Sequence, residues 1–144
     1  MKRTAGILMP VFSLPSRYGI GCFSKSAYDF VDWLRGAGQT YWQILPLCPT
    51  SFGDSPYQSF STFAGSPYYI SLESLIEEGV LRESDCAAAD FGTKPDRIDY
   101  EKLYKARQCF LIIIEQEDEL CFKGAIKRMG WEIFHTFAFL NDFF

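Results

Sequence analysis

The sequence predicts an α/β fold whose strands run parallel. Two apolar runs, residues 5–12 and 40–47, have the composition of buried strands. Residues 26–36, between them, carry apolar side chains at the i, i+3, i+4 and i+7 positions of one helix face. A strand, a helix and a second strand in this order form a βαβ unit, which implies parallel pairing and a right-handed crossover.

The first half of this unit is defined by its local sequence. We expect the first strand, Ala5–Phe12, to be buried on both faces, because it is apolar throughout. Two serines, a proline and two glycines make residues 13–21 a loop. Ser24 or Ser26 is the expected cap of the helix, and the glycines of 36–38 end it.

The second strand, Thr40–Leu47, begins with residues that favour strands and is followed by a long loop, Cys48–Pro67. Loops of this length without secondary structure of their own are uncommon and often functional. Beyond the loop we expect a short strand over Tyr68–Leu72. A helical turn over Leu72–Glu78 then stops at Gly79.

The last part of the chain is predicted to be mainly helical. Residues 82–97 are polar and are expected to be irregular, whereas helical spacing of apolar residues begins at Asp99. The acidic stretch Glu115–Glu119 fits a solvated helix end. A final helix is expected from Phe122 into the apolar segment Trp131–Phe144.

Composition excludes several classes of protein. The 144 residues are 48% hydrophobic and 17% aromatic, which excludes a disordered tail, and no apolar run approaches the ~20 residues of a membrane span. A net charge of −4 argues against binding to nucleic acid or to a membrane surface. One histidine and five scattered cysteines give no metal site and indicate a reducing, cytoplasmic location. Motifs for nucleotide binding and for metal or serine hydrolases are absent, so we expect no cofactor.

The long loop carries the only residues that suggest a ligand. It follows the carboxyl end of a buried parallel strand, which is the edge where α/β proteins assemble their sites. Aromatic faces suit the apolar side of a sugar ring, and Asp, Ser and Gln suit its hydroxyl groups. Two other interpretations remain open: the loop only covers the end of the sheet, or Asp54 serves its own backbone in an Asx turn.

Several long motifs occur in order along the chain: AGILMPVFSLPSRYGIG (5–21), GQTYWQILPL (38–47), GDSPYQSFS (53–61), AGSPY (64–68) and IDYEKLYKAR (98–107). They resemble the N-terminal region of the amylomaltases, and the resemblance covers about residues 3–110. These enzymes are 4-α-glucanotransferases, also called disproportionating enzymes, and are related to the α-amylase barrels. The chain departs from the family pattern in residues 122–144, where WEIFHTFAFL (131–140) replaces a Trp-Leu-x-Asp-Tyr-like helix.

The resemblance implies the first β/α units of a (β/α)8 TIM-type barrel, incomplete in this chain. A closed barrel takes about 250 residues, so we expect the remainder of the barrel to be a missing partner of residues 1–144. Residues 1–80 would supply the first βαβ units and the substrate loop. Residues 81–144 would form a mostly helical subdomain with a divergent tail.

The resemblance also implies a substrate and a set of binding residues. An α-1,4-glucan or maltooligosaccharide would bind Asp54, Ser55, Pro56, Tyr57 and Gln58 on the donor side of the cleft. Phe52 stands where some members use a tyrosine in a second glucan groove, so stacking is kept without a hydroxyl contact.

Family chemistry moves a glucan segment to an acceptor sugar by a retaining double displacement. The nucleophile Asp and the acid/base Glu lie about 5–5.5 Å apart across the scissile bond in such enzymes. Both are expected beyond residue 144, so no acidic residue here is catalytic and the chain alone is expected to be inactive. The alternatives are a truncated, non-catalytic glucan-binding fragment and an unrelated small α/β domain with a structural loop.

Overall fold

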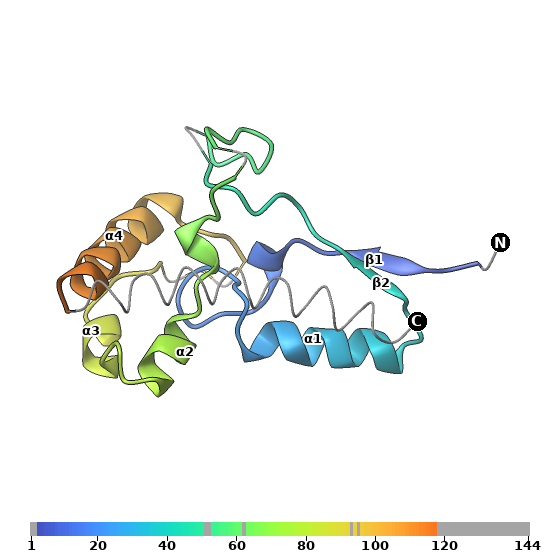
Figure 1. Ribbon diagram of the computed structural model, residues 1–144, viewed down its shortest axis with the longest axis horizontal. Helices are drawn as coiled ribbons and strands as arrows, with labels where there is room; N and C mark the ends of the chain where they lie inside the picture. Colours follow the sequence, from blue (N-terminus) through green and yellow to red (C-terminus); the bar gives the residue numbers. More distant parts are fainter. Residues whose placement is uncertain (1–2, 51–52, 62, 93, 95, 118–144) are drawn as a thin grey trace.

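The computed structural model describes residues 3–50, 53–61, 63–92, 94 and 96–117 (Figure 1). The final helix expected from Phe122 and the divergent tail lie outside the described residues, as does Phe52. None of the helices within the described ranges is long and apolar enough to cross a lipid bilayer.

A βαβ unit opens the chain, as the apolar pattern predicts. Strands β1 (Gly6–Leu8) and β2 (Tyr41–Gln43) pair in parallel, with Ile7 opposite Trp42, and helix α1 (Lys25–Gly36) lies between them in sequence. The Trp42 indole donates a hydrogen bond from Nε1 to the carbonyl oxygen of Met9 at 2.7 Å, which extends the contact beyond the strands.

Both strands are shorter than their apolar runs. Pro10 has no backbone N–H to donate to a ladder, and directly after it the chain turns into a 3-10 helix, η1 (Val11–Ser13). The expectation that the first strand is buried on both faces is wrong: Ile7 is 36% and Leu8 57% exposed. Among the described residues, β1 has β2 as its only strand neighbour, so little covers its side chains.

Helix α1 packs through the predicted apolar stripe. Ser24 is its N-cap residue, although its side chain makes no capping hydrogen bond, and Gly38 follows the helix with φ +70°. The buried face of α1 packs with residues from β2, from the segment 11–23 and from the later residue Tyr69. Together they form the strand core, which comprises Val11, Leu14, Phe23, Ala27, Val31, Leu34, Trp42 and Tyr69.

The second half is helical. It contains a 3-10 helix, η2 (Pro67–Tyr69), and the α-helices α2 (Leu72–Glu77), α3 (Glu83–Ala87) and α4 (Tyr100–Glu117). The predicted helices from residues 72 and 99 are confirmed. The strand expected over 68–72 is wrong, because Ser66 and Ser71 each accept a backbone N–H and start helical turns. Helix α3 lies in the segment expected to be irregular.

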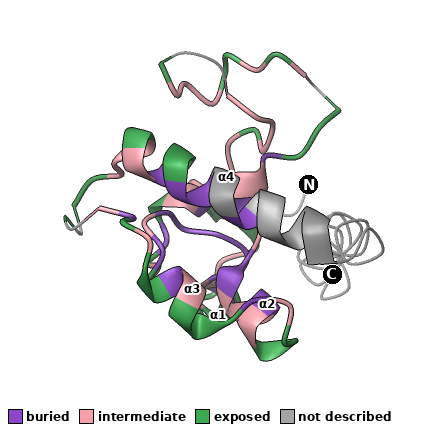
Figure 2. Cartoon of the chain, turned by 90° about the vertical axis from the view of Figure 1, so that its left-hand side faces the viewer, coloured by how far each residue is buried: buried purple, intermediate pink, exposed green. Residues whose placement is uncertain are grey.

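A second cluster, the helical core, lies between α2, α3 and α4. Figure 2 shows the buried residues of α4 on the side that faces the other two helices. The loop before α1 also contributes, so the core draws on distant parts of the sequence. Its members are Tyr18, Ile20, Leu72, Leu75, Leu81, Cys86, Phe91, Leu103, Ala106 and Phe110.

Candidate functional site

The loop of residues 48–66 projects from the body of the molecule, beyond the carboxyl end of β2 (Figure 1). Its two ends meet, because the Ser66 N–H donates to the carbonyl oxygen of Leu47 at 2.8 Å. Inside the loop, Thr50 and Ser59 form an antiparallel bridge. The 48–66 loop is therefore a closed loop with its own hydrogen bonds.

Serine side chains hold the loop from within. The Ser59 hydroxyl lies 2.8 Å from the Pro49 carbonyl oxygen and accepts the N–H of Ser61 at 3.1 Å. The Ser61 hydroxyl in turn accepts the N–H of Ala64 at 3.2 Å. These contacts give backbone groups the partners that a sheet or helix would otherwise supply, so the high serine content has a structural role.

The predicted binding segment, 54–58, is a tight turn. Asp54 has φ +53°, in the left-handed region that aspartate tolerates better than most residues. The carbonyl oxygen of Ser55 accepts the N–H of Gln58 at 3.0 Å, with Pro56 at the turn position that favours proline. The turn leaves Tyr57 and Gln58 exposed, while the other three residues are half-buried.

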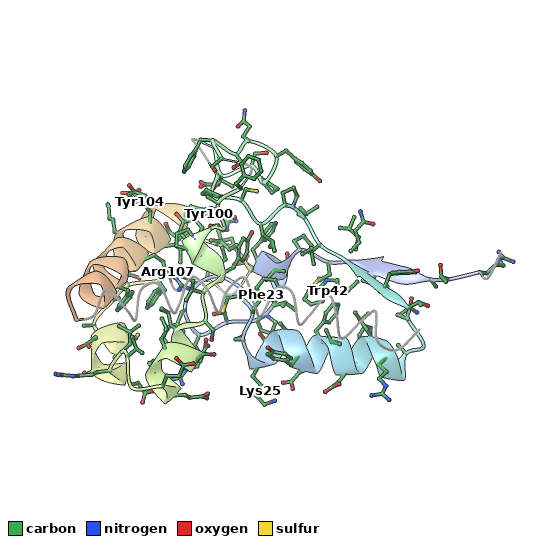
Figure 3. All side chains as sticks on the ribbon, in the orientation of Figure 1. Phe23, Lys25, Trp42, Tyr100, Tyr104 and Arg107 are labelled. Atoms are coloured by element: carbon green, nitrogen blue, oxygen red, sulfur yellow. The ribbon has the colours of Figure 1, made fainter. Side chains whose placement is uncertain are left out.

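The charge of Asp54 acts on a pair of tyrosines on other elements. Burial raises the pKa of Tyr68, on η2, and of Tyr100, at the start of α4, and the negative charge of Asp54 raises both further. The two rings lie 6.4 Å apart between centroids and are tilted by 50°. Figure 3 shows Tyr100 and Tyr104 on the side of α4 nearest the 48–66 loop.

These tyrosines are absent from the site predicted from sequence. Tyr68 and Tyr100 both lie in segments that carry the family resemblance, but nothing local to either segment indicates that they meet. The four-residue spacing of Tyr100 and Tyr104 places those two rings on one helix face, but it gives no sign of Tyr68.

Exposed aromatic rings gather on the loop. Tyr57 and Phe60 are each 74% exposed, and Phe63 is fully exposed. Single exposed apolar residues are common on protein surfaces, but three exposed rings within seven residues of one loop are available to a flat apolar ligand surface. Together with Asp54, Ser55 and Gln58, this surface can stack on sugar rings and bind their hydroxyl groups.

The loop has no pair of carboxylates for glycosyl transfer. Asp54 is the only acidic residue in the sequence from 48 to 66, whereas a retaining transfer needs two carboxyl groups about 5–5.5 Å apart. The described residues also contain no group of three or more His, Cys, Asp or Glu side chains placed to hold a metal ion. The arrangement is suited to binding rather than to bond cleavage.

Comparison with known proteins identifies the family. Residues 9–136 match the family described as 4-alpha-glucanotransferase. The 4-alpha-glucanotransferase of Streptococcus pneumoniae is 56% identical over 150 aligned residues, covering 99% of this chain and 30% of the relative. That of Thermus thermophilus is 48% identical, covering 72% of this chain and 20% of its own length.

A solved structure shares the fold. The amylomaltase from Streptococcus agalactiae in complex with acarbose matches with a TM-score of 0.78 and 42% identity, over 85% of this chain and 25% of that chain. The chain thus spans less than a third of the length of each of these relatives. The sequence match and the shared α/β structure show that the chain belongs to the 4-alpha-glucanotransferase family.

Proposed function

We propose that this chain forms the loop side of a glucan-binding cleft in a 4-α-glucanotransferase. The enzyme would transfer α-1,4-glucan segments to an acceptor sugar by a retaining double displacement. The nucleophile Asp and the acid/base Glu would come from outside residues 1–144, where the resemblance to the family puts them, and the loop itself holds only one acidic residue. Family membership supports this activity, and so does the acarbose complex of the solved relative.

One observation carries the assignment of the site. The turn formed by Ser55 and Gln58 projects Tyr57 into solvent at 74% exposure, while Ser66 and Leu47 tie the base of the loop together. An exposed ring on a fixed turn is arranged for stacking on a pyranose. We assign donor-side glucan binding to Asp54, Ser55, Pro56, Tyr57 and Gln58, and stacking in a second groove to Phe52.

The strands support a larger barrel. Ile7, Leu8 and Tyr41 are exposed apolar residues on the β1–β2 pair, as expected where further strands of a (β/α)8 barrel would pack. In this proposal residues 1–80 supply the first barrel units with their substrate loop, and residues 81–144 form a mostly helical subdomain. The chain alone would bind glucan weakly and turn none over.

The test replaces Tyr57 in the full-length enzyme. Stacking of a sugar on its ring buries apolar area worth roughly 1–2 kcal/mol, so Tyr57→Ala should lower kcat/KM for maltooligosaccharides about ten-fold. Tyr57→Phe should lower it less if stacking dominates. As a matched control, Tyr28→Ala removes an exposed tyrosine from α1 and should leave kcat/KM unchanged.

Two outcomes would contradict the proposal. An unchanged kcat/KM in a folded Tyr57→Ala enzyme would remove the loop from the substrate site. Disproportionation of maltotriose by residues 1–144 alone would contradict the assignment of the catalytic carboxylates to the rest of the protein. Binding of maltoheptaose by residues 1–144 without turnover is the expected result.

A further inference from the structure

Arg107 is a buried cation with unused hydrogen-bonding capacity. It lies on α4, is only 4% exposed, and donates one hydrogen bond, from Nη1 to the carbonyl oxygen of Ile70 at 2.9 Å. Its Nε and Nη2 are buried without a partner among the described residues. Burial lowers the pKa of the guanidinium, and the thiols of Cys22 and Cys86, the Glu73 carboxylate and the Tyr68 phenol oppose that shift.

The carbonyl that Arg107 holds lies at the junction between the loop and the helical core. Ile70 directly follows η2, and η2 begins after Ser66, whose N–H closes the 48–66 loop on Leu47. The partly buried Tyr68 and Ile70 both pack against the helical core. One hydrogen bond from α4 therefore fixes the segment to which the end of the loop is attached.

The charge of Arg107 also acts on Tyr68. The guanidinium lowers the pKa of Tyr68, whereas burial and the charge of Asp54 raise it. The Tyr68 ring lies 6.4 Å, between centroids, from that of Tyr100, which is about two helix turns before Arg107 on α4. The segment held by Arg107 thus also packs on the first turn of α4.

An apolar side chain of similar length would fill this space without the cost of burying a charge. It would leave the partly buried Ile70 carbonyl without the donor on α4, and a carbonyl that loses its partner favours a shift of its segment toward water. The specific contribution of Arg107 is therefore its donor to Ile70.

We infer that Arg107 is a positioning residue for the 48–66 loop: by holding the Ile70 carbonyl, it fixes the segment at which the loop closes and thereby keeps the 54–58 turn in its binding arrangement. Arg107 does not contact the sugar itself. This inference rests on the proposed role of the loop in glucan binding.

The experiment measures hydrogen exchange in the full-length protein for Arg107→Met, Arg107→Lys and a control, Arg35→Met, on the exposed side of α1. The reporters are the amides of Gln58 and Ser66, whose hydrogen bonds define the turn and the loop closure. In Arg107→Met we expect at least ten-fold faster exchange at both, unchanged exchange in α1, and a raised KM for maltooligosaccharides with kcat nearly unchanged. Arg107→Lys keeps a charged donor and should stay within about three-fold of the wild type.

The outcomes separate the two proposals. Faster loop exchange with an unchanged KM would support positioning by Arg107 and overturn the role of the loop in glucan binding. Unchanged loop exchange in folded Arg107→Met would overturn the positioning role, whatever happens to KM. If Arg107→Met does not fold, Arg107→Gln, which is neutral and shorter, takes its place: at least ten-fold faster exchange at Gln58 and Ser66 than in Arg107→Lys supports the inference, and equal exchange overturns it.

Discussion

The strand core and the helical core are assembled in different ways. Apart from Tyr69, the strand core uses residues from one continuous stretch, 11–42, in the order of a βαβ unit. The helical core instead joins the loop residues Tyr18 and Ile20 to helices that begin at residue 72. The strand core can be predicted from the local spacing of apolar residues, whereas the helical core forms only when segments far apart in the sequence pack together.

Two short segments connect the cores. Along η2, Tyr69 points into the strand core, where its ring meets Phe23 edge-on at 6.4 Å, while its neighbours Tyr68 and Ile70 pack on the helical core. Phe12 packs against both clusters. The 48–66 loop is attached at this boundary, so its position depends on both cores.

The largest effects should follow from cavities in either core. Leu34→Ala in the strand core and Leu103→Ala in the helical core each remove a fully buried side chain, and each should cost about 2–5 kcal/mol of unfolding free energy. Because η2 and Phe12 couple the cores, both variants should unfold in a single transition, followed by circular dichroism and tyrosine fluorescence. Two separate transitions in Leu103→Ala would show that the cores fold independently.

The same contrast explains how much of the fold could be predicted. Helix α1 and the parallel pairing follow from apolar spacing, and α4 follows from the repeat after Asp99. The strand expected over 68–72 failed because Ser66, Pro67 and Ser71 favour helical starts, which outweigh the strand preference of the aromatic and β-branched residues between them. Helix α3 is short and polar, so periodicity gave no signal.

For the candidate site too, local features could be predicted from the sequence and contacts between distant segments could not. The position of the 48–66 loop after β2, and the turn at Pro56, follow from local sequence. The pairing of the Tyr68 and Tyr100 rings does not, because it depends on how α4 packs across η2. The hydrogen bond from Arg107 to Ile70 is a product of the same packing.

A glycine substitution tests the segment that crosses from one core to the other. A Cβ on Gly21 would collide with the backbone carbonyl oxygens of Val11 and Leu14, the latter at 2.6 Å, and backbone cannot swing aside as a side chain can. We expect Gly21→Ala to cost about 3 kcal/mol, measured by urea denaturation. Gly36→Ala, at the end of α1 with nothing within 4 Å, is the control and should stabilise by roughly 0.5–1 kcal/mol. Equal effects would refute the close approach at Gly21.

Alkaline pH should weaken the boundary at η2. Burial raises the pKa of Tyr69 to about 12, with smaller contributions from Tyr100 and Cys48. The folded state therefore keeps the Tyr69 proton while the unfolded state loses it near pH 10, so this stabilisation is complete below pH 10 and is lost as pH rises to 12. Tyr69→Phe should reduce the loss of unfolding free energy over that range by an amount on the order of 2 kcal/mol. The measurement is denaturant titration of both proteins at pH 9 and 11.5. An equal loss of unfolding free energy in the wild type and in Tyr69→Phe would contradict the prediction.

The smallest effect distinguishes the surfaces of the two regions. Each has an exposed ion pair four residues apart on a helix: Lys25 with Asp29 on α1, and Glu101 with Lys105 on α4, both at 2.6 Å. Near a helix N-terminus the dipole favours an acidic residue and disfavours a basic one, so the α4 pair has the favourable order and the α1 pair the reverse. The two pairs should therefore respond differently when their first residue is removed.

Glu101→Ala should lower the unfolding free energy by about 0.3–0.5 kcal/mol at low salt, whereas Lys25→Ala should leave it unchanged or raise it slightly. The change in unfolding free energy should shrink in both variants in 1 M salt, because the screening length between exposed charges is then only about 3 Å. An equal loss of stability in the two variants, measured by thermal unfolding at low salt, would mean that direct pairing outweighs the dipole at both helix starts.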